Sequence, residues 1–212
     1  MLGHLDIIDK SLGDTVAEEL GMPGEAITMT PAAVPIDLDP SPALRLYGKY
    51  EPTLKGRKVG VLLAAGFNLK LKNALVSAIE KEGATAAIIA PKVGGVEDSA
   101  GAKHTAAMAL SGSPSVLFDA VAILAGRAGD EALSANPDAV GFLMDACRHL
   151  KAIGLSEVPG LAAKADALSR PGITDLNATK DIAVFIDFAR KGKVWEREPE
   201  KTPLAGRTRR AK

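Results

Sequence analysis

The sequence has one cysteine, three histidines and few aromatic residues. Cys147 has no partner for an intrachain disulfide, which is typical of a reducing compartment, so we expect a cytoplasmic protein. Aromatic residues make up 4% of the 212 residues, too few for a base-stacking platform. His4, His104 and His149 lie in separate segments without a second ligand at helical or hairpin spacing, and no metal site is predicted.

An excess of charge of either sign is also missing, because 26 basic residues balance 26 acidic ones. A neutral chain has no global field to hold nucleic acid or an anionic membrane surface. No apolar run approaches the ~20 residues that a membrane helix needs, and the first residues do not read as a signal peptide. The basic run within residues 198–212 is either a nucleic-acid arm or a flexible solubilising tail, and we expect the tail.

The first 54 residues divide into a helix and a linker. Residues 1–21 predict one amphipathic helix, over 5–20, because Leu5, Ile8 and Leu12 share a stripe and Gly21 supplies a stop. Residues 22–54 predict an extended linker, since proline disfavours helix at its own position and at the preceding one. The prolines of this segment are Pro23, Pro31, Pro35, Pro40, Pro42 and Pro52.

Residues 55–197 predict one α/β domain. Residues 58–64 form an unbroken apolar run after a charged entry, which is how a strand buried on both faces of a parallel sheet reads. Strands and helices then alternate, which predicts a doubly wound parallel sheet with helices on both faces. The other expected strands are 84–90, 119–124, 152–155 and 173–176, the helices 69–82, 137–150, 160–168 and 179–191, with a hairpin at 92–106.

Ligands of such folds bind at the carboxyl ends of the strands. After the first strand, the turn with Gly66 and Asn68 has one glycine, so it lacks the Gly-x-Gly-x-x-Gly pattern that lets backbone amides approach a phosphate. After the third strand, Gly126–Gly129 with Arg127 is either a small-anion loop or a plain strand-to-helix turn. No cofactor is predicted from these turns.

Two residues could act as nucleophiles. Cys147 lies within a predicted helix beside its apolar face, where a cysteine behaves as a small core residue. Ser156 follows the fourth strand, where a nucleophile elbow would stand, but no Gly-x-Ser-x-Gly frame surrounds it. Ser156 is therefore either a hydroxyl nucleophile or a loop residue. Trp195 is expected to anchor the end of the chain to the core.

Several segments, in this order and spacing, resemble the C-terminal part of large-subunit haem catalases. They are residues 41–44, 54–62, 113–116, 118–121, 147–154 and 193–195. The resemblance implies a flavodoxin-like domain of the PfpI-protease and class I glutamine-amidotransferase-like superfamily, joined to a catalase barrel by a wrapping linker. Haem would belong to that barrel, because Tyr47 and Tyr50 lack the family's arginine four residues earlier, where Ala43 and Leu46 stand.

The resemblance also implies what the domain does. Active members of the superfamily carry a cysteine at the elbow and an acid after the first strand. An ungapped reading places Leu155 at the elbow and Leu69, or the neighbouring Asn68, at the acid, and a shift of one residue would place Ser156 at the elbow. Asn68, Gly126, Leu155 and Ser156 would then line a vestigial pocket without chemistry. The implied role is non-catalytic: tetramer stability, peroxide access and chaperone-like binding of unfolded clients. The alternatives are a hydrolase or glyoxalase that uses Ser156, or a small-anion binding module.

Overall fold

The computed structural model describes residues 2–22, 41–44, 51–168 and 170–197. The chain divides into two compact units, residues 1–49 with 200–212 and residues 50–199, and each is described by itself. Most of the expected linker, residues 23–40 and 45–50, lies outside the described residues, as does the expected tail at 198–212.

In the described part of the first unit, the helices are α1 (Leu2–Ile8) and α2 (Lys10–Glu19). The prediction of one helix over residues 5–20 was wrong at Asp9, whose carboxylate accepts a hydrogen bond of 2.9 Å from the backbone N–H of Ser11. This cap starts a new helix, because a short acidic side chain competes with the backbone for hydrogen bonds. The expected stop is confirmed at Gly21, which has a φ of 71°.

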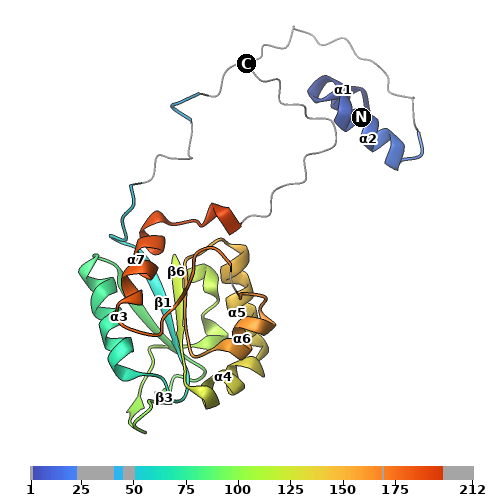
Figure 1. Cartoon of the computed structure of the whole chain (residues 1–212). Helices are drawn as coiled ribbons and strands as arrows, with labels where there is room; N and C mark the ends of the chain where they lie inside the picture. Colours follow the sequence, from blue (N-terminus) through green and yellow to red (C-terminus); the bar gives the residue numbers. More distant parts are fainter. Residues whose placement is uncertain (1, 23–40, 45–50, 169, 198–212) are drawn as a thin grey trace. The chain divides into compact units, whose positions relative to one another are not determined.

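The second unit is built on a six-stranded parallel sheet with the order β5-β2-β1-β6-β7-β8 (Figure 1). Without the two-residue edge strand β5, this is the flavodoxin-like order 2-1-3-4-5, so the predicted fold is confirmed. The strands are β1 (Lys58–Leu63), β2 (Thr85–Ala90), β5 (Met108–Ala109), β6 (Ala120–Leu124), β7 (Ile153–Ser156) and β8 (Ile173–Asp175). An antiparallel pair, β3 (Val96–Glu97) and β4 (Lys103–His104), confirms the expected hairpin.

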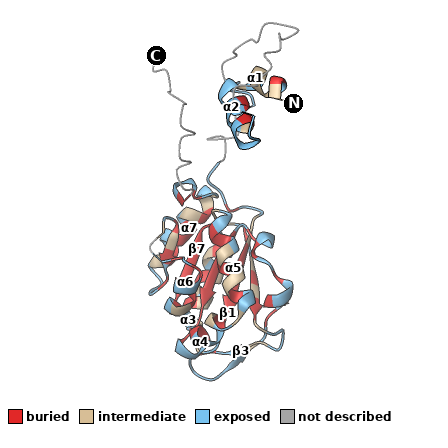
Figure 2. Cartoon of the chain, turned by 90° about the vertical axis from the view of Figure 1, so that its right-hand side faces the viewer, coloured by how far each residue is buried: buried red, intermediate tan, exposed pale blue. Residues whose placement is uncertain are grey.

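Helices cover both faces of the sheet, as Figure 1 shows. One face packs against α3 (Leu69–Lys81) and α7 (Asp181–Lys191). The other packs against α4 (Arg127–Ser134), α5 (Pro137–Arg148) and α6 (Pro159–Lys164). Strand β6 serves both cores, because Val121 and Ile123 face α5 while Ala122 and Leu124 face the α3 side. Figure 2 accordingly shows buried strands between helices whose outer faces are exposed.

Two local predictions differ from the structure. Helix α4 occupies residues for which only a glycine turn was expected, because Leu133 and the buried Asp130 attach it to the domain. The end of the described chain is anchored by Val194 and Arg197, while Trp195 is 49% exposed. Arg197 donates hydrogen bonds of 3.0 and 2.8 Å to the carbonyl oxygen of Pro171.

Candidate functional site: the crevice at the carboxyl ends of the strands

The turns that leave the two central strands touch each other. Strands β1 and β6 flank the point where the strand order reverses, which is the usual ligand crevice of this fold. Here the backbone N–H of Gly126 donates a hydrogen bond of 2.9 Å to the carbonyl oxygen of Ala65. A Cβ on Gly126 would lie 2.7 Å from the carbonyl oxygen of Gly66, so only glycine permits this approach. The crevice is therefore closed by backbone at its centre.

The β3–β4 hairpin closes the same turn from the other side. The backbone N–H of Gly66, a natural donor to an anion, donates instead to the carbonyl oxygen of Glu97 at 2.9 Å. The backbone N–H of Ser99 donates to the carbonyl oxygen of Phe67 at 3.0 Å, and Phe67 forms an isolated bridge with Asp98. The Gly66 N–H and the Phe67 carbonyl group of the turn after β1 are thus bound to the hairpin and are not free for a ligand.

Asp98 and His104 fasten this hairpin. The Asp98 side chain is 1% exposed, and its Oδ2 lies 2.7 Å from Nε2 of His104. The hydrogen bond to His104 holds the pKa of Asp98 below its ordinary value, and backbone N–H groups of Ala102 and Ala100 add to the effect. His104 also meets the Phe67 ring edge-on at 5.3 Å. His104 is therefore held between the Asp98 carboxylate and the Phe67 ring.

Asn68, at the position where active relatives would need an acid, caps a helix. Its Oδ1 accepts a hydrogen bond of 3.0 Å from the backbone N–H of Leu71, in the first turn of α3. Leu69, the other residue considered for the acid, is the first residue of α3. Neither side chain supplies a carboxylate to the crevice.

The strained elbow after β7 falls at a residue that the ungapped reading did not select. Leu155 and Ser156 both belong to the extended strand β7 and are buried. The left-handed backbone occurs at Glu157, which has a φ of 55° and an exposed side chain. The placement of Leu155 or Ser156 at the elbow was therefore wrong by one or two positions, because a single sequence does not reveal where a strand ends. The elbow holds a carboxylate.

An internal carboxylate occupies the helix end that follows the elbow. Oδ2 of Asp130, on α4, accepts a hydrogen bond of 2.8 Å from the backbone N–H of Gly160, and Oδ1 accepts one of 2.9 Å from that of Leu161. These are the free amides of the first turn of α6, where an anion would otherwise bind. A Cβ at Gly160 would meet Asp130 Oδ2 at 2.9 Å, so the fit is close.

The proposed anion loop, Gly126–Gly129, is the beginning of α4 rather than an open turn. Gly126 is its N-cap residue, and Arg127 points into solvent, where its Nε lies 3.3 Å from Glu131 of the same helix. Gly129 packs against the first turn, since a Cβ there would lie 2.5 Å from the carbonyl oxygen of Ala65. The glycines thus serve close packing between two turns.

Cys147 and Lys151 are ionisable groups buried away from the crevice. Burial raises the pKa of the Cys147 thiol, which favours the unreactive protonated form. Lys151 is 4% exposed, and its Nζ donates to the carbonyl oxygens of Ser115 and, at 2.5 Å, of Phe118. Burial and the neighbouring Lys193 lower the pKa of Lys151 to about 8. Sequence reasoning missed this lysine, because the long-range contacts that bury it leave no local signal.

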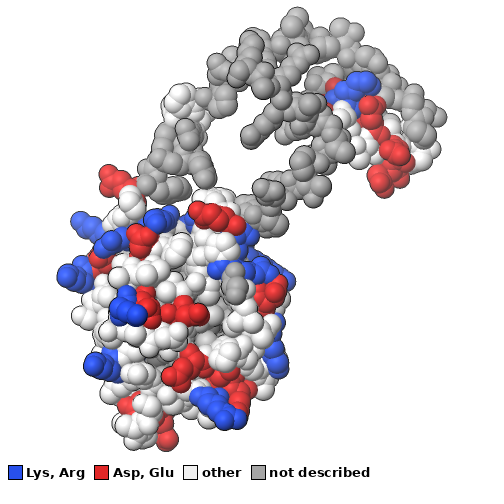
Figure 3. All heavy atoms as spheres, in the orientation of Figure 1, with Lys and Arg blue, Asp and Glu red and all other residues white. Residues whose placement is uncertain are grey.

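The surface carries mixed charges. Figure 3 shows basic and acidic side chains interspersed over the face of the domain in view. Within the described segments, no group of three or more histidine, cysteine, aspartate or glutamate side chains is arranged to hold a metal ion. None of the described helices is long and apolar enough to cross a membrane.

The strand order defines a flavodoxin-like α/β domain. At its usual ligand site, the backbone N–H groups described above donate to acceptors of the domain itself. Residues 55–199 match the C-terminal domain found in long catalases, and the chain belongs to this family. It is 37% identical over 211 residues to Catalase C of Rhizobium meliloti (strain 1021), covering 94% of this chain and 29% of that protein. It is 30% identical over 194 residues to Catalase HPII of Pseudomonas putida, covering 90% of this chain and 27% of that protein.

The chain therefore spans less than a third of the length of these relatives. Among solved structures, it is similar to a two-domain protein from Anabaena variabilis that contains DJ-1/ThiJ/PfpI-like and ferritin-like domains. That match has 18% identity and a TM-score of 0.49, and covers 53% of this chain and 34% of the other.

Proposed function

We propose that this chain is a non-catalytic C-terminal domain that stabilises the tetramer of a peroxide-decomposing, large-subunit catalase. The observation that carries the proposal is the occupied crevice: Asp130 takes the amides of α6, and the turn amides of Gly66 and Gly126 bind the protein's own carbonyl groups. Donors that are bound by the protein's own acceptors are not free to stabilise a developing charge. Haem would be held by the barrel.

Purified chain offers a direct test of the non-catalytic part. We expect no peroxide decomposition above the rate of free haem, with or without haem added. The same preparation should be inactive on methylglyoxal, ester and peptide substrates. Turnover of any of these by the chain, lost in a variant that still folds, would overturn the proposal.

The stabilising part needs a partner surface, and exposed apolar side chains offer one. Val116 and Leu117 are adjacent and 65% and 48% exposed. Adjacent apolar side chains of this kind favour a protein contact. Added in trans to a long-catalase barrel that lacks its C-terminal domain, the chain should raise the thermal midpoint of the assembly. Val116→Asp should lose the effect, whereas Val184→Asp, on the α7 side, serves as the matched control.

Two finer roles are proposed with the same surface in mind. Exposed apolar side chains could bind unfolded clients, so the chain should suppress aggregation of a heat-denatured test protein, and Val116→Asp should weaken that effect. A role in peroxide access predicts a different KM for peroxide in the assembly with and without this chain. Equal KM values would exclude the access role, and unchanged aggregation would exclude the chaperone role.

One observation favours a second candidate function, a hydrolase or glyoxalase. The backbone elbow at Glu157 has kept the left-handed conformation that presents nucleophiles in related folds. Ser156, immediately before it, would be the nucleophile and would need a base. Activity abolished by Ser156→Ala but retained in Ser77→Ala, at an exposed serine of α3, would establish this function. The anion-module alternative at Gly126–Gly129 predicts a thermal shift with millimolar nucleotide or flavin.

A further inference from the structure

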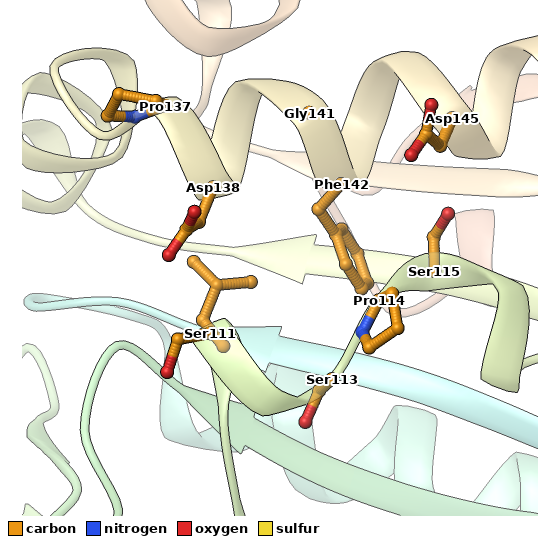
Figure 4. Close-up of a pocket in the computed structure, with 10 residues that line it drawn as sticks. Ser111, Ser113, Pro114, Ser115, Pro137, Asp138, Gly141, Phe142 and Asp145 are labelled. Atoms are coloured by element: carbon orange, nitrogen blue, oxygen red, sulfur yellow. The ribbon is translucent and has the colours of Figure 1, made fainter.

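A pocket separate from the crevice lies between α5 and the segment of residues 110–115 (Figure 4). Its volume is about 230 Å³. The segment belongs to the return from the edge strand β5 to the central strand β6. Pockets for drug-sized ligands are larger, roughly 300–1,000 Å³, so this one suits a small molecule.

Two carboxylates stand at the two ends of the pocket. Asp138 and Asp145 both line it from α5, and Figure 4 shows their side chains on the side of the helix that faces the segment. Seven positions are about two helical turns, which places them roughly 10 Å apart along the axis. The described lining contains no lysine or arginine. The charge of the buried Lys151 interacts with Asp145, but its ammonium group donates to the carbonyl oxygens of Ser115 and Phe118.

A buried hydroxyl without a partner faces the same space. Ser115 is 1% exposed, and its Oγ has no hydrogen-bond partner among the described residues. Figure 4 shows this side chain directed from the segment toward α5 and Asp145. The carbonyl oxygen of the same residue is bound by Lys151, which fixes the segment in place. An unpaired buried hydroxyl is unfavourable, and a ligand that donates to Ser115 would satisfy it.

The walls between the carboxylates are apolar. Phe142, which is 4% exposed, and Pro114 line the middle of the pocket, and Gly141 leaves its centre open. A Cβ added at Gly141 would meet no atom within 4 Å. The pocket thus combines an apolar middle with a negative group at each end.

One metal ion does not fit this arrangement, because two carboxylates separated by two helical turns cannot coordinate the same ion at about 2–2.6 Å. An elongated ligand does fit. We propose that the pocket binds a short linear aliphatic dication, an alkyl diamine or a guanidinoalkylamine. Its two cationic ends would pair with Asp138 and Asp145, one of them would donate to Ser115, and its methylene chain would lie on Phe142.

Calorimetric titration of the full chain with putrescine and agmatine tests this, with n-butylamine as the monocation of matched length. We expect saturable binding of the dications. Butylamine should bind at least about tenfold more weakly than they do, since the loss of one charge-assisted hydrogen bond corresponds to about that factor in affinity. Equal binding of butylamine, or no saturable binding of either dication, would overturn the proposal.

Variants separate the pocket from general charge effects. Asp138→Asn and Asp145→Asn should each weaken agmatine binding about tenfold, whereas Asp187→Asn, an exposed aspartate on α7, should leave it unchanged. Equal loss in Asp187→Asn would show nonspecific attraction instead.

Gly141→Met keeps both carboxylates but fills the centre of the pocket. Because a side chain at this position meets open space, the variant should fold, as judged by its circular dichroism and thermal midpoint, and should bind agmatine at least tenfold more weakly. Unchanged binding in a folded Gly141→Met chain would place the ligand elsewhere and overturn the assignment.

Discussion

Oδ2 of Asp130 accepts a hydrogen bond of 2.8 Å from the backbone N–H of Gly160, a residue thirty positions later in the chain. The contact joins the helix after β6 to the helix after β7. It also places a carboxylate where the fold would otherwise bind an anion. The Asp130 side chain thus takes the place that an anionic ligand would occupy.

Asp130→Ala should lower the free energy of unfolding by about 1–3 kcal/mol, because the N–H groups of Gly160 and Leu161 both lose their acceptor. Chemical denaturation measures the change. Asp187→Asn, which removes an exposed carboxylate, should stay within about 0.5 kcal/mol of the parent. Equal stability of Asp130→Ala and the parent would mean that water or a rearranged side chain replaces the carboxylate at no cost.

Glu157→Gly should stabilise the domain by up to about 1 kcal/mol, because a side chain at a φ of 55° is strained and glycine is not. The control is Ala132→Gly, within α4, which should cost about 1 kcal/mol. Thermal unfolding of the two variants should therefore shift in opposite directions. A destabilised Glu157→Gly would show that the glutamate side chain itself supports the elbow.

Lys151 predicts a dependence of stability on alkaline pH. Its pKa is lowered to about 8 in the folded state, below the value of about 10.4 in an unfolded chain. Between these values the unfolded state binds more protons, so this group makes the free energy of unfolding rise with pH from about 8 to 10.4.

Lys151→Met should lose that rise. The quantity to measure is the difference between the free energies of unfolding of parent and variant across the pH range. The contributions of the other titrating groups, including Cys147, cancel in this difference. The variant also leaves the carbonyl oxygens of Ser115 and Phe118 without their donor, which shifts its stability at every pH. A difference that does not change with pH would contradict a lowered pKa.

Two glycines make a matched pair for packing. A Cβ at Gly60, within β1, would lie 2.8 Å from the Phe118 ring, whereas a Cβ at Gly141 would meet no atom within 4 Å. Gly60→Ala should cost about 1–3 kcal/mol through overpacking. Gly141→Ala should stabilise α5 by about 0.5–1 kcal/mol. Denaturant midpoints that move in the same direction for both variants would argue against this packing.

The sequence predicted the sheet well because its signals are local. The unbroken apolar run from residue 58 matches β1, and alternation along the chain predicted the doubly wound parallel sheet. The flavodoxin-like order itself was implied by the family resemblance. Asp9 shows the limit at short range, since one capping side chain divides an otherwise continuous helical pattern. Strand β5 has two residues, too few to give any periodic signal.

The crevice was less predictable because it is made by contacts between distant residues. Gly126 and Gly129 looked like an anion loop, while the partners that give them their role are Ala65 and Gly66. Asp130 carries no sequence signal for its bonds to the start of α6. The elbow required the exact end of β7, which local pattern does not provide. That Asn68, Gly126, Leu155 and Ser156 line a vestigial pocket without chemistry stays a prediction.

The contact between Gly66 and Gly126 has a consequence for protein engineering. A substrate that entered between the ends of β1 and β6 would have to part these two turns, because a Cβ on Gly126 would already lie 2.7 Å from the carbonyl oxygen of Gly66. A designer of a new enzyme on this scaffold would have to separate these two turns first, and one added methyl group at Gly126 would be the smallest wedge. The chemistry would come second.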